Sequence, residues 1–114
     1  MKKGTVVLTL FPFTDLTSSK RRPAVVISDS VSDQNDVIVA FVSSVIPPAF
    51  SETDFFYDTL QPDFSQSGLK KSSIIKLDKL ATINKSIISG ELGAMNNRSI
   101  ETINRKLKIA LGLD

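Results

Sequence analysis

Short apolar segments separated by polar, turn-like stretches make up most of this chain. Residues 5–11 alternate between apolar and threonine positions, which predicts a half-buried strand. The β-branched runs at 24–28 and 37–43 predict two strands that are buried on both faces. Weaker patterns predict further strands over 55–60 and over 73–77, the latter continuing or bending into the LATI segment.

The connections are predicted from polar residues, proline and glycine. Residues 11–23 are rich in Pro, Ser, Thr and Asp and predict an exposed loop. A double proline ends the third strand, because proline cannot donate a hydrogen bond to a sheet. Residues 62–72 predict a loop that turns at Gly68. The segment 85–93 stays ambiguous, since its two glycines argue against a long helix.

An amphipathic helix is predicted at the end of the chain. Either Asn96 or Asn97 is the expected N-cap, and Gly112 is the expected stop. The apolar positions recur at helical spacing and define one face: Ile100, Ile103, Leu107, Ala110 and Leu111.

Together these elements predict a mainly β fold with one helix. We expect a small SH3-like β-barrel or a strongly bent antiparallel sheet, with a C-terminal α-helix, in a single domain over residues 1–114. No apolar run approaches the roughly 18–20 residues needed to span a bilayer. The first residues favour a strand over a signal peptide, so we expect a cytoplasmic protein without membrane contact.

Histidine and cysteine are both absent, which narrows the chemistry. Their absence excludes a Ser-His-Asp triad, a thiolate nucleophile, a disulfide framework and a zinc site built from His or Cys. Any catalysis must use hydroxyls, carboxylates, Lys, Arg, Tyr or backbone groups. The aspartates are scattered without the close spacing of a carboxylate metal motif, so we expect no metal and no cofactor.

The net charge is only +2, but basic and acidic residues are distributed very unevenly along the chain. Residues 1–22 carry five basic groups and one acid, a net of +4, and residues 70–114 carry nine and four, a net of +5. Residues 23–69 have seven acids and no base, a net of −7. The two basic blocks are either ordinary solvated surface or, brought together by folding, a phosphate-binding surface.

The junction Lys20-Arg21-Arg22-Pro23 is the first candidate for function. Proline restricts Arg22 to extended geometry at the start of a strand, where the position of a side chain is well defined. A guanidinium there can grip a phosphate through two hydrogen bonds. The alternative is a basic surface cluster at the start of a strand, which this pattern taken alone favours.

The pair Ser43-Ser44 is the second candidate, because it ends the apolar run VIVAFV. A hydroxyl at the end of a rigid strand is well placed to hydrogen-bond a phosphate oxygen. The alternative is that these serines simply end the strand, as serines commonly do.

Several segments resemble one known family when taken in order. The run GTVVLTLFPFTDLTSSKRRPAVVIS resembles the opening of PemK/MazF family toxins, in which a strand leads through a polar loop to an Arg-Pro step and a second strand. The resemblance continues through VIVAFVSS and through the stretch from GLKKSSIIKLDKLATINK to the last helix. It covers nearly the whole chain, and its specificity lies in the order and spacing of the motifs.

The resemblance implies roles for individual residues. Arg22 matches the family's catalytic arginine before proline, and Ser43 stands where the family usually has threonine. Asp78 matches an acidic position after the fifth strand, and Lys79 stands where many members have glutamine. Thr17 occupies the position of a frequent family glutamate, which leaves the general base unassigned.

The family's reaction agrees with the missing residue types. Its members cleave single-stranded RNA without metal, using the RNA's own 2′-hydroxyl against the neighbouring phosphate. Under this implied function, Arg22 stabilises the phosphorane and Ser43 orients the phosphate. An arginine whose pKa exceeds about 12 is a poor general base at neutral pH.

Further residues are candidates for binding RNA. Phe13 offers a stacking face, with packing into the loop or core as the favoured alternative. The candidate phosphate or polar contacts are Lys20, Arg21, Ser44, Lys70, Lys71, Asp78 and Lys79. For Lys70 and Lys71, which lie in a predicted loop, simple solvation of the charge explains their presence equally well.

The resemblance also implies partners and leaves alternatives. It implies a homodimeric toxin of a type II toxin–antitoxin system that inhibits translation and growth and is silenced by a cognate antitoxin protein. One alternative is a non-catalytic toxin of the same fold that poisons DNA gyrase. Another is an inactive barrel-type binding module, which the threonine at position 17 would permit.

Overall fold

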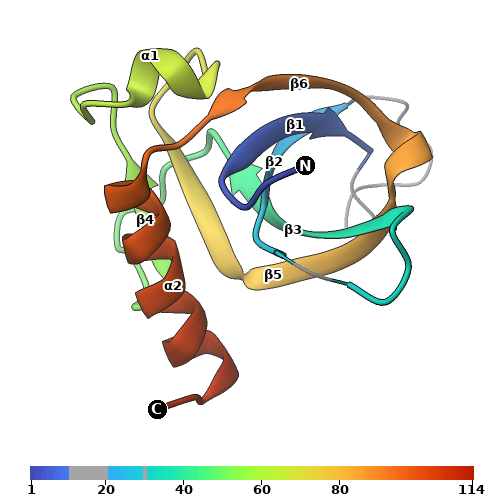
Figure 1. Ribbon diagram of the computed structural model, residues 1–114. Coiled ribbons are helices and arrows are strands. Elements are labelled where there is room, and N and C mark those ends of the chain that lie inside the picture. Colours follow the sequence, from blue (N-terminus) through green and yellow to red (C-terminus); the bar gives the residue numbers. More distant parts are fainter. Residues whose placement is uncertain (11–20, 30) are drawn as a thin grey trace.

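The described part of the chain forms one antiparallel sheet of six strands with a long helix at its C-terminal end (Figure 1). This architecture comes from a computed structural model, which describes residues 1–10, 21–29 and 31–114. The strands are β1 (Thr5–Thr9), β2 (Arg22–Val26), β3 (Asp36–Ser43), β4 (Asp54–Tyr57), β5 (Ser73–Asn84) and β6 (Ile88–Ala94). The helical segments are α1 (Phe64–Ser67), the 3₁₀-helix η1 (Lys85–Ile87) and α2 (Asn97–Leu111).

The strands lie in the order β4-β5-β3-β2-β1-β6, and each neighbouring pair is antiparallel. Figure 1 shows that the sheet curls strongly, so that β6 returns above β1. Within the described residues β4 and β6 are not paired with each other. The predicted mainly β fold with a C-terminal helix is therefore confirmed, whereas closure into an SH3-like barrel is not.

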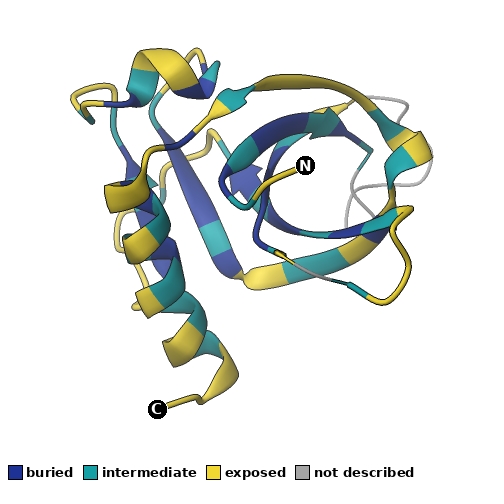
Figure 2. Cartoon of the chain, viewed as in Figure 1, coloured by how far each residue is buried: buried dark blue, intermediate teal, exposed yellow. Residues whose placement is uncertain are grey.

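Alternating side chains from the central strands fill two separate hydrophobic clusters. Val6 and Val25 point to the first cluster, which includes Ile103 of α2, while Val7 and Ala24 point to the second. Strands β2 and β3 contribute buried residues to both clusters, as the β-branched runs predicted (Figure 2). We call the surface of the sheet on which α2 packs the helix face. The opposite surface carries the buried second cluster, and we call it the open face because α2 does not cover it.

Helix α2 agrees with the sequence prediction at both ends. The side chain of Asn96 accepts a hydrogen bond from the Ser99 N–H at 2.9 Å, which identifies Asn96 as the N-cap. Gly112 ends the helix in the left-handed conformation, with φ of 68°. Of the predicted apolar face, Ile103 is fully buried, whereas Leu111 is 57% exposed. The last turn therefore extends beyond the sheet that the rest of the helix covers.

Several element boundaries differ from those predicted. The first strand ends at Thr9, and β4 covers Asp54–Tyr57 rather than 55–60. The fifth strand does continue through the LATI segment, as far as Asn84. The ambiguous segment 85–93 forms η1 and most of β6, and the predicted loop 62–72 contains the short helix α1.

Two glycines let α1 approach β6 closely. Gly68 ends α1 with φ of +77°, in the left-handed region that glycine adopts without strain. A Cβ built on Gly93 of β6 would lie 2.0 Å from the carbonyl oxygen of Gln66. The backbone of α1 thus rests directly on β6, in a space that no larger residue could share.

Among the described residues, no helix has both the length and the apolar composition needed to cross a membrane.

Candidate functional site

Arg22 lies at the first position of β2, with its side chain exposed. Its backbone pairs with Thr9 of β1, so the position of its Cα is fixed by the sheet. The guanidinium makes no hydrogen bond or ion pair with any described residue, whereas Nη1 of the preceding Arg21 donates to the Ile87 carbonyl at 3.4 Å. Arg22 is thus an exposed cation at a position fixed by the sheet, and Arg21 is directed towards η1.

Ser43 ends β3 at the same edge of the sheet. The antiparallel pairs Ala24–Phe41 and Val25–Ala40 place the start of β2 and the end of β3, and so Arg22 and Ser43, at the same end of this strand pair. Both residues alternate in phase with the side chains of the second cluster, so both belong to the open face. The structure therefore brings together the two residues predicted as catalytic.

The hydroxyl of Ser43 also shapes the turn that follows β3. Its Oγ accepts a hydrogen bond from the Val45 N–H at 3.2 Å, which leaves the hydroxyl hydrogen available to donate to a ligand. The neighbouring Ser44 is exposed. Because successive residues of a strand point to opposite faces, Ser43 rather than Ser44 shares a face with Arg22.

A surface depression of about 230 Å³ opens beside Ser43, between β3 and β5. Its walls combine apolar and polar side chains from both strands and from the turn after β3: Phe41, Ser43, Val45, Pro47, Ile74, Lys76 and Lys79. Two of these, Phe41 and Lys76, pair directly across the strands. We call this feature the β3–β5 pocket.

Lys76 is held at the pocket by a buried carboxylate. Its Nζ lies 2.7 Å from Oδ1 of Asp54, whose side chain is only 3% exposed. The Oδ2 atom of Asp54 accepts from the Ser51 N–H at 2.9 Å, so both carboxylate oxygens have partners. Burial raises the pKa of Asp54, but its hydrogen bonds to Lys76 and Ser51 outweigh this effect and hold the pKa below the usual 3.8.

Strand β5 bulges where it passes the pocket. Phe41 pairs with Lys76, but the preceding Ala40 pairs with Leu80, so three residues of β5 lie unpaired between these positions. Two of them are Asp78 and Lys79, both exposed. The resemblance placed Asp78 after the fifth strand, whereas it lies inside β5, because that strand continues through the LATI segment.

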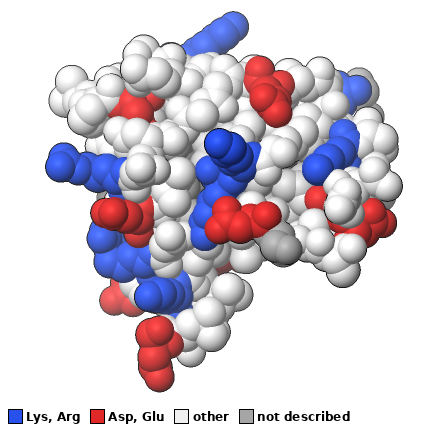
Figure 3. Space-filling view, viewed as in Figure 1, with Lys and Arg blue, Asp and Glu red and all other residues white. Residues whose placement is uncertain are grey.

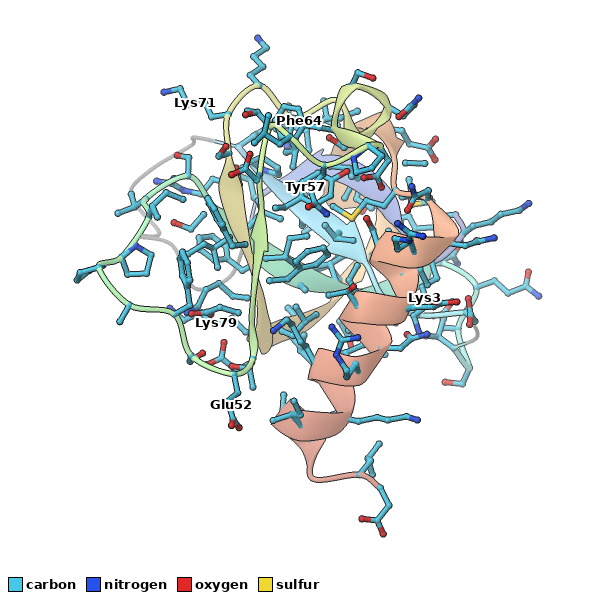
Figure 4. All side chains as sticks on the ribbon, turned by 90° about the vertical axis from the view of Figure 1, so that its left-hand side faces the viewer. Lys3, Glu52, Tyr57, Phe64, Lys71 and Lys79 are labelled. Atoms are coloured by element: carbon cyan, nitrogen blue, oxygen red, sulfur yellow. The ribbon has the colours of Figure 1, made fainter. Side chains whose placement is uncertain are left out.

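Lys79 lies on this bulge and also lines the pocket. Its Nζ lies 5.9 Å from the centroid of the Phe41 ring, within the range of a cation–π contact. Figure 4 shows Lys79 and Lys71 on well separated parts of this side of the molecule. Lys79 on the bulge of β5 and Lys71 before the start of β5 are thus not gathered at one point.

Lys70 and Lys71 are exposed and immediately precede β5. Ile74 of β5 pairs with Ser43, so these two lysines reach the same edge of the sheet as the end of β3. On the face shown in Figure 3, basic and acidic side chains are interspersed along α2 and do not form one continuous positive area. Phe13, Asp15, Thr17 and Lys20 lie outside the described residues.

A second group of titratable residues is buried under α1, away from the pocket. Asp63 is 3% exposed, and its Oδ2 accepts from the Asn96 N–H at 2.8 Å. Burial raises the pKa of Asp63, but the hydrogen bond from the Asn96 N–H and the hydroxyl groups of Tyr57 and Ser99 together outweigh this effect and hold the pKa below 3.8. Burial also raises the pKa of Tyr57, whose ring packs beside Phe64 (Figure 4). This group joins β4, α1 and α2.

Of the residues that line the pocket, the sequence analysis named Ser43 and Lys79 as candidates and did not name the others. Phe41 looked like an ordinary strand residue, and Lys76 was passed over inside the segment SIIKL. A lysine at a single position of an otherwise apolar strand is the signal that was available. Within the described ranges, no three His, Cys, Asp or Glu side chains gather in a way that could hold a metal ion.

Comparisons with known proteins agree with the fold. Residues 2–111 match the family described as PemK-like, MazF-like toxin of type II toxin-antitoxin system. No curated protein matches the sequence. Among solved structures, the chain is similar to an endoribonuclease in complex with its cognate antitoxin from a mycobacterial species, at 17% identity and a TM-score of 0.74, covering 100% of this chain and 97% of that chain.

Two further solved structures are similar over almost their whole length. The MazE–MazF structure (Form-II) from Deinococcus radiodurans is 16% identical, with a TM-score of 0.73 and coverage of 100% of this chain and 97% of that chain. The Mycobacterium tuberculosis toxin MazF-mt6 is 18% identical, with a TM-score of 0.72 and coverage of 98% and 99%. At these identities the likeness establishes a shared fold.

Proposed function

This chain belongs to the PemK-like, MazF-like toxins of type II toxin–antitoxin systems, and on that premise we propose that it is an endoribonuclease that cleaves single-stranded RNA without metal. Cleavage of messenger RNA would inhibit translation and growth. The observation that carries the proposal is the placement of Arg22 and Ser43 at one edge of the sheet, on its open face, within a chain that matches the family almost end to end.

The proposed reaction needs no group beyond the RNA and the protein. The 2′-oxygen of the ribose attacks the adjacent phosphorus, a bond forms between them, and the bond from phosphorus to the 5′-oxygen of the next nucleotide breaks. The 2′-hydroxyl loses its proton, and the departing 5′-oxygen gains one. The products are a 2′,3′-cyclic phosphate and a 5′-hydroxyl. The reaction passes through a phosphorane, whose added negative charge must be stabilised.

Arg22 supplies that stabilisation in this proposal. Its guanidinium is always charged and presents donors in a plane that matches two phosphate oxygens. Because the backbone of Arg22 is fixed in the sheet, little reorganisation is needed when the charge develops. Ser43 donates its free hydroxyl hydrogen to a phosphate oxygen and so orients the group for in-line attack.

The protein residue that takes the 2′-proton is unassigned. Arg22 is too basic for that role at neutral pH. The family's frequent glutamate is Thr17 here, outside the described residues. Asp78 is exposed on the bulge of β5 and is proposed only as an RNA contact, together with Ser44, Lys70, Lys71 and Lys79.

A digest of single-stranded RNA in the presence of a chelator tests the proposed activity. The wild-type protein should yield discrete fragments, and Arg22→Ala should lower the rate at least about 100-fold, the usual effect of removing one stabilising donor. Arg105→Ala is the matched control, because it removes an exposed arginine of α2 that is not among the candidate RNA contacts. Intact RNA at high protein concentration would leave the gyrase poison or the binding module as the better account. Equal cleavage by the Arg22 variant would point to another site.

The same family membership supports two protein partners. We include in the proposal a cognate antitoxin, since two of the similar structures contain a toxin with its antitoxin. We also include a homodimer, which agrees with the exposed apolar side chains at the end of α2, Ile109, Leu111 and Leu113. Sedimentation of the purified protein should give the mass of a dimer. The proposed compartment is the cytoplasm, where both messenger RNA and antitoxin would be met.

A further inference from the structure

The β3–β5 pocket has the composition of a site for one flat ring system. At about 230 Å³ it is smaller than the roughly 300–1,000 Å³ of pockets for drug-sized ligands. Its apolar walls include Ile74 and the ring of Phe41, and its polar groups are a hydroxyl and two ammonium groups. Such a pocket suits an unpaired base that packs against apolar side chains and accepts hydrogen bonds at its edge.

Lys76 differs from the exposed lysines of this edge because it is fixed in place. Its side chain is 24% exposed, and the buried carboxylate of Asp54 holds its Nζ at 2.7 Å. An ammonium group has three N–H donors, so two remain after this contact. A donor whose position is set by the fold can distinguish one ligand edge from another, whereas a mobile surface lysine cannot.

The ion pair also decides what Lys76 recognises. The charges of Lys76 and Asp54 compensate each other, so this pair attracts a phosphate much less than an isolated lysine does. What remains is hydrogen-bond donation towards the pocket. Lys79 lies over Phe41 at the rim and adds donors on the same side. Both lysines donate and neither can accept, so the pocket favours a ligand edge that carries acceptors.

From this arrangement we infer that the β3–β5 pocket reads a base of the RNA, with Lys76 as a specificity-determining residue that donates to a carbonyl oxygen of that base. Guanine and uracil present such oxygens on their recognition edges, whereas adenine has none. The inference rests on the proposed ribonuclease function, because it places the base next to a phosphate held by Ser43 at the edge of the pocket. Asp54 acts as a positioning residue, since it touches Lys76 and not the base.

The test compares binding of two short single-stranded oligonucleotides, one of uridine and one of adenosine. Both carry 2′-O-methyl groups, which block cleavage, and fluorescence anisotropy gives the dissociation constants. The wild-type protein should prefer the uridine oligonucleotide. The double variant Lys76→Met with Asp54→Asn removes the donor without leaving a buried carboxylate unpaired, and should lower this preference about tenfold, the value of one base-discriminating contact. Lys108→Met, an exposed lysine of α2, is the matched control and should leave the preference unchanged.

The alternative outcomes are separable. An unchanged preference in the double variant, or a wild-type protein without preference, overturns the inference. Equal weakening of binding to both oligonucleotides would show that Lys76 contacts phosphate, which overturns it as well. Digestion of unmodified RNA by the wild-type protein is run in parallel. RNA cleavage without a Lys76-dependent preference leaves the proposed function standing and removes the inference. A Lys76-dependent preference without RNA cleavage would contradict the proposed ribonuclease function but would still support base recognition by the pocket.

Discussion

Arg22 and Ser43 reach the same edge of the sheet because β2 and β3 are antiparallel neighbours, so that the start of one strand and the end of the other lie on the same side. The two side chains differ in how they are held. The backbone of Arg22 is held by its pairing with Thr9, whereas the side-chain oxygen of Ser43 also accepts a hydrogen bond from the N–H of Val45. The hydroxyl is therefore part of the turn after β3, and in the proposed function it also donates to the phosphate.

Substitutions of Ser43 separate these two roles. Ser43→Ala loses the hydroxyl, and kcat/KM on RNA should fall about tenfold, the worth of one hydrogen bond to a charged oxygen. Ser43→Thr keeps the hydroxyl, which the family usually carries as threonine, and should retain nearly the wild-type value. Thermal unfolding of both variants shows whether the turn survives. If Ser43→Ala keeps full activity, the hydroxyl does not contact the phosphate.

The buried carboxylates make stability sensitive to acid. The pKa values of Asp54 and Asp63 are lowered by folding, so their stabilisation is fully present above the unfolded value of 3.8 and is lost as the pH falls through the folded pKa. Urea unfolding should give a constant free energy from about pH 7 to pH 5 and a decline near and below pH 4. Asp63→Asn should make this decline shallower. An equally steep decline in that variant would show that Asp63 does not contribute to the loss of stability in acid.

At the scale of residues, the sequence predicted candidate side chains that can be recognised from the residues next to them. Arg22 precedes a proline at the start of an apolar run, and Ser43 ends another such run, so each could be recognised locally. The pair of Lys76 and Asp54 could not, because the two residues are 22 positions apart and meet only through the pairing of β4 with β5. Nothing in their local sequence specifies that register.

Among the elements, α1 and β6 show how a very short helix is held. Helix α1 has four residues, too few to be stable alone, and its backbone rests on Gly93. The hydroxyl of its last residue, Ser67, donates to the Phe64 carbonyl at 2.6 Å and accepts from the Leu69 N–H at 3.1 Å. Tertiary contact and local hydrogen bonds therefore define α1, since its length cannot.

Alanine substitutions of two glycines in β6 test this contact. A Cβ on Gly93 would lie 2.0 Å from the Gln66 carbonyl oxygen, so Gly93→Ala must push α1 away from β6. We expect the free energy of unfolding to fall by roughly 1–3 kcal/mol, as for other overpacked sites. Gly90→Ala is the matched control, because nothing lies within 4 Å of its Cβ position. Equal stability of both variants would show that α1 does not rest on β6 in solution.

The elements that were missed have weak signals for physical reasons. Segment 62–72 is polar and contains a proline and a glycine, which are typical of a loop, and one turn of helix leaves no periodicity to detect. Strand β6 is largely exposed and pairs with β1 along one side only, so it lacks the apolar alternation of the central strands. By contrast α2, with fifteen residues and two caps, was predictable almost to the residue.

In the whole molecule, the charge blocks of the sequence are partly rearranged by folding. Two of the seven acids in residues 23–69, Asp54 and Asp63, are buried and bonded within the fold. The topology brings Arg22 from the first basic block and Lys70 and Lys71 from the last to one edge of the sheet. The acidic middle of the chain therefore does not separate the basic blocks in space.

The two lysines before β5 are expected to contact RNA through its phosphates. Lys70→Ala with Lys71→Ala should weaken binding similarly for all sequences and should make the dependence of log K on log salt shallower by about 1.4, the value for two phosphates of a single strand. The matched control replaces Arg105 and Lys108 on α2 and should leave the salt dependence unchanged. An unchanged slope in the first variant would assign these lysines to plain solvation.

The central claim is that this chain cleaves RNA by attack of the 2′-hydroxyl at a phosphate held by Arg22. The most direct measurement uses one RNA oligonucleotide that the protein cuts at a single place, and the same oligonucleotide with a single 2′-deoxynucleotide on the 5′ side of that bond. If the 2′-hydroxyl is the nucleophile, the deoxynucleotide should abolish cutting at this bond, and the unmodified RNA should yield a 2′,3′-cyclic phosphate. Equal cutting of both oligonucleotides would contradict this claim.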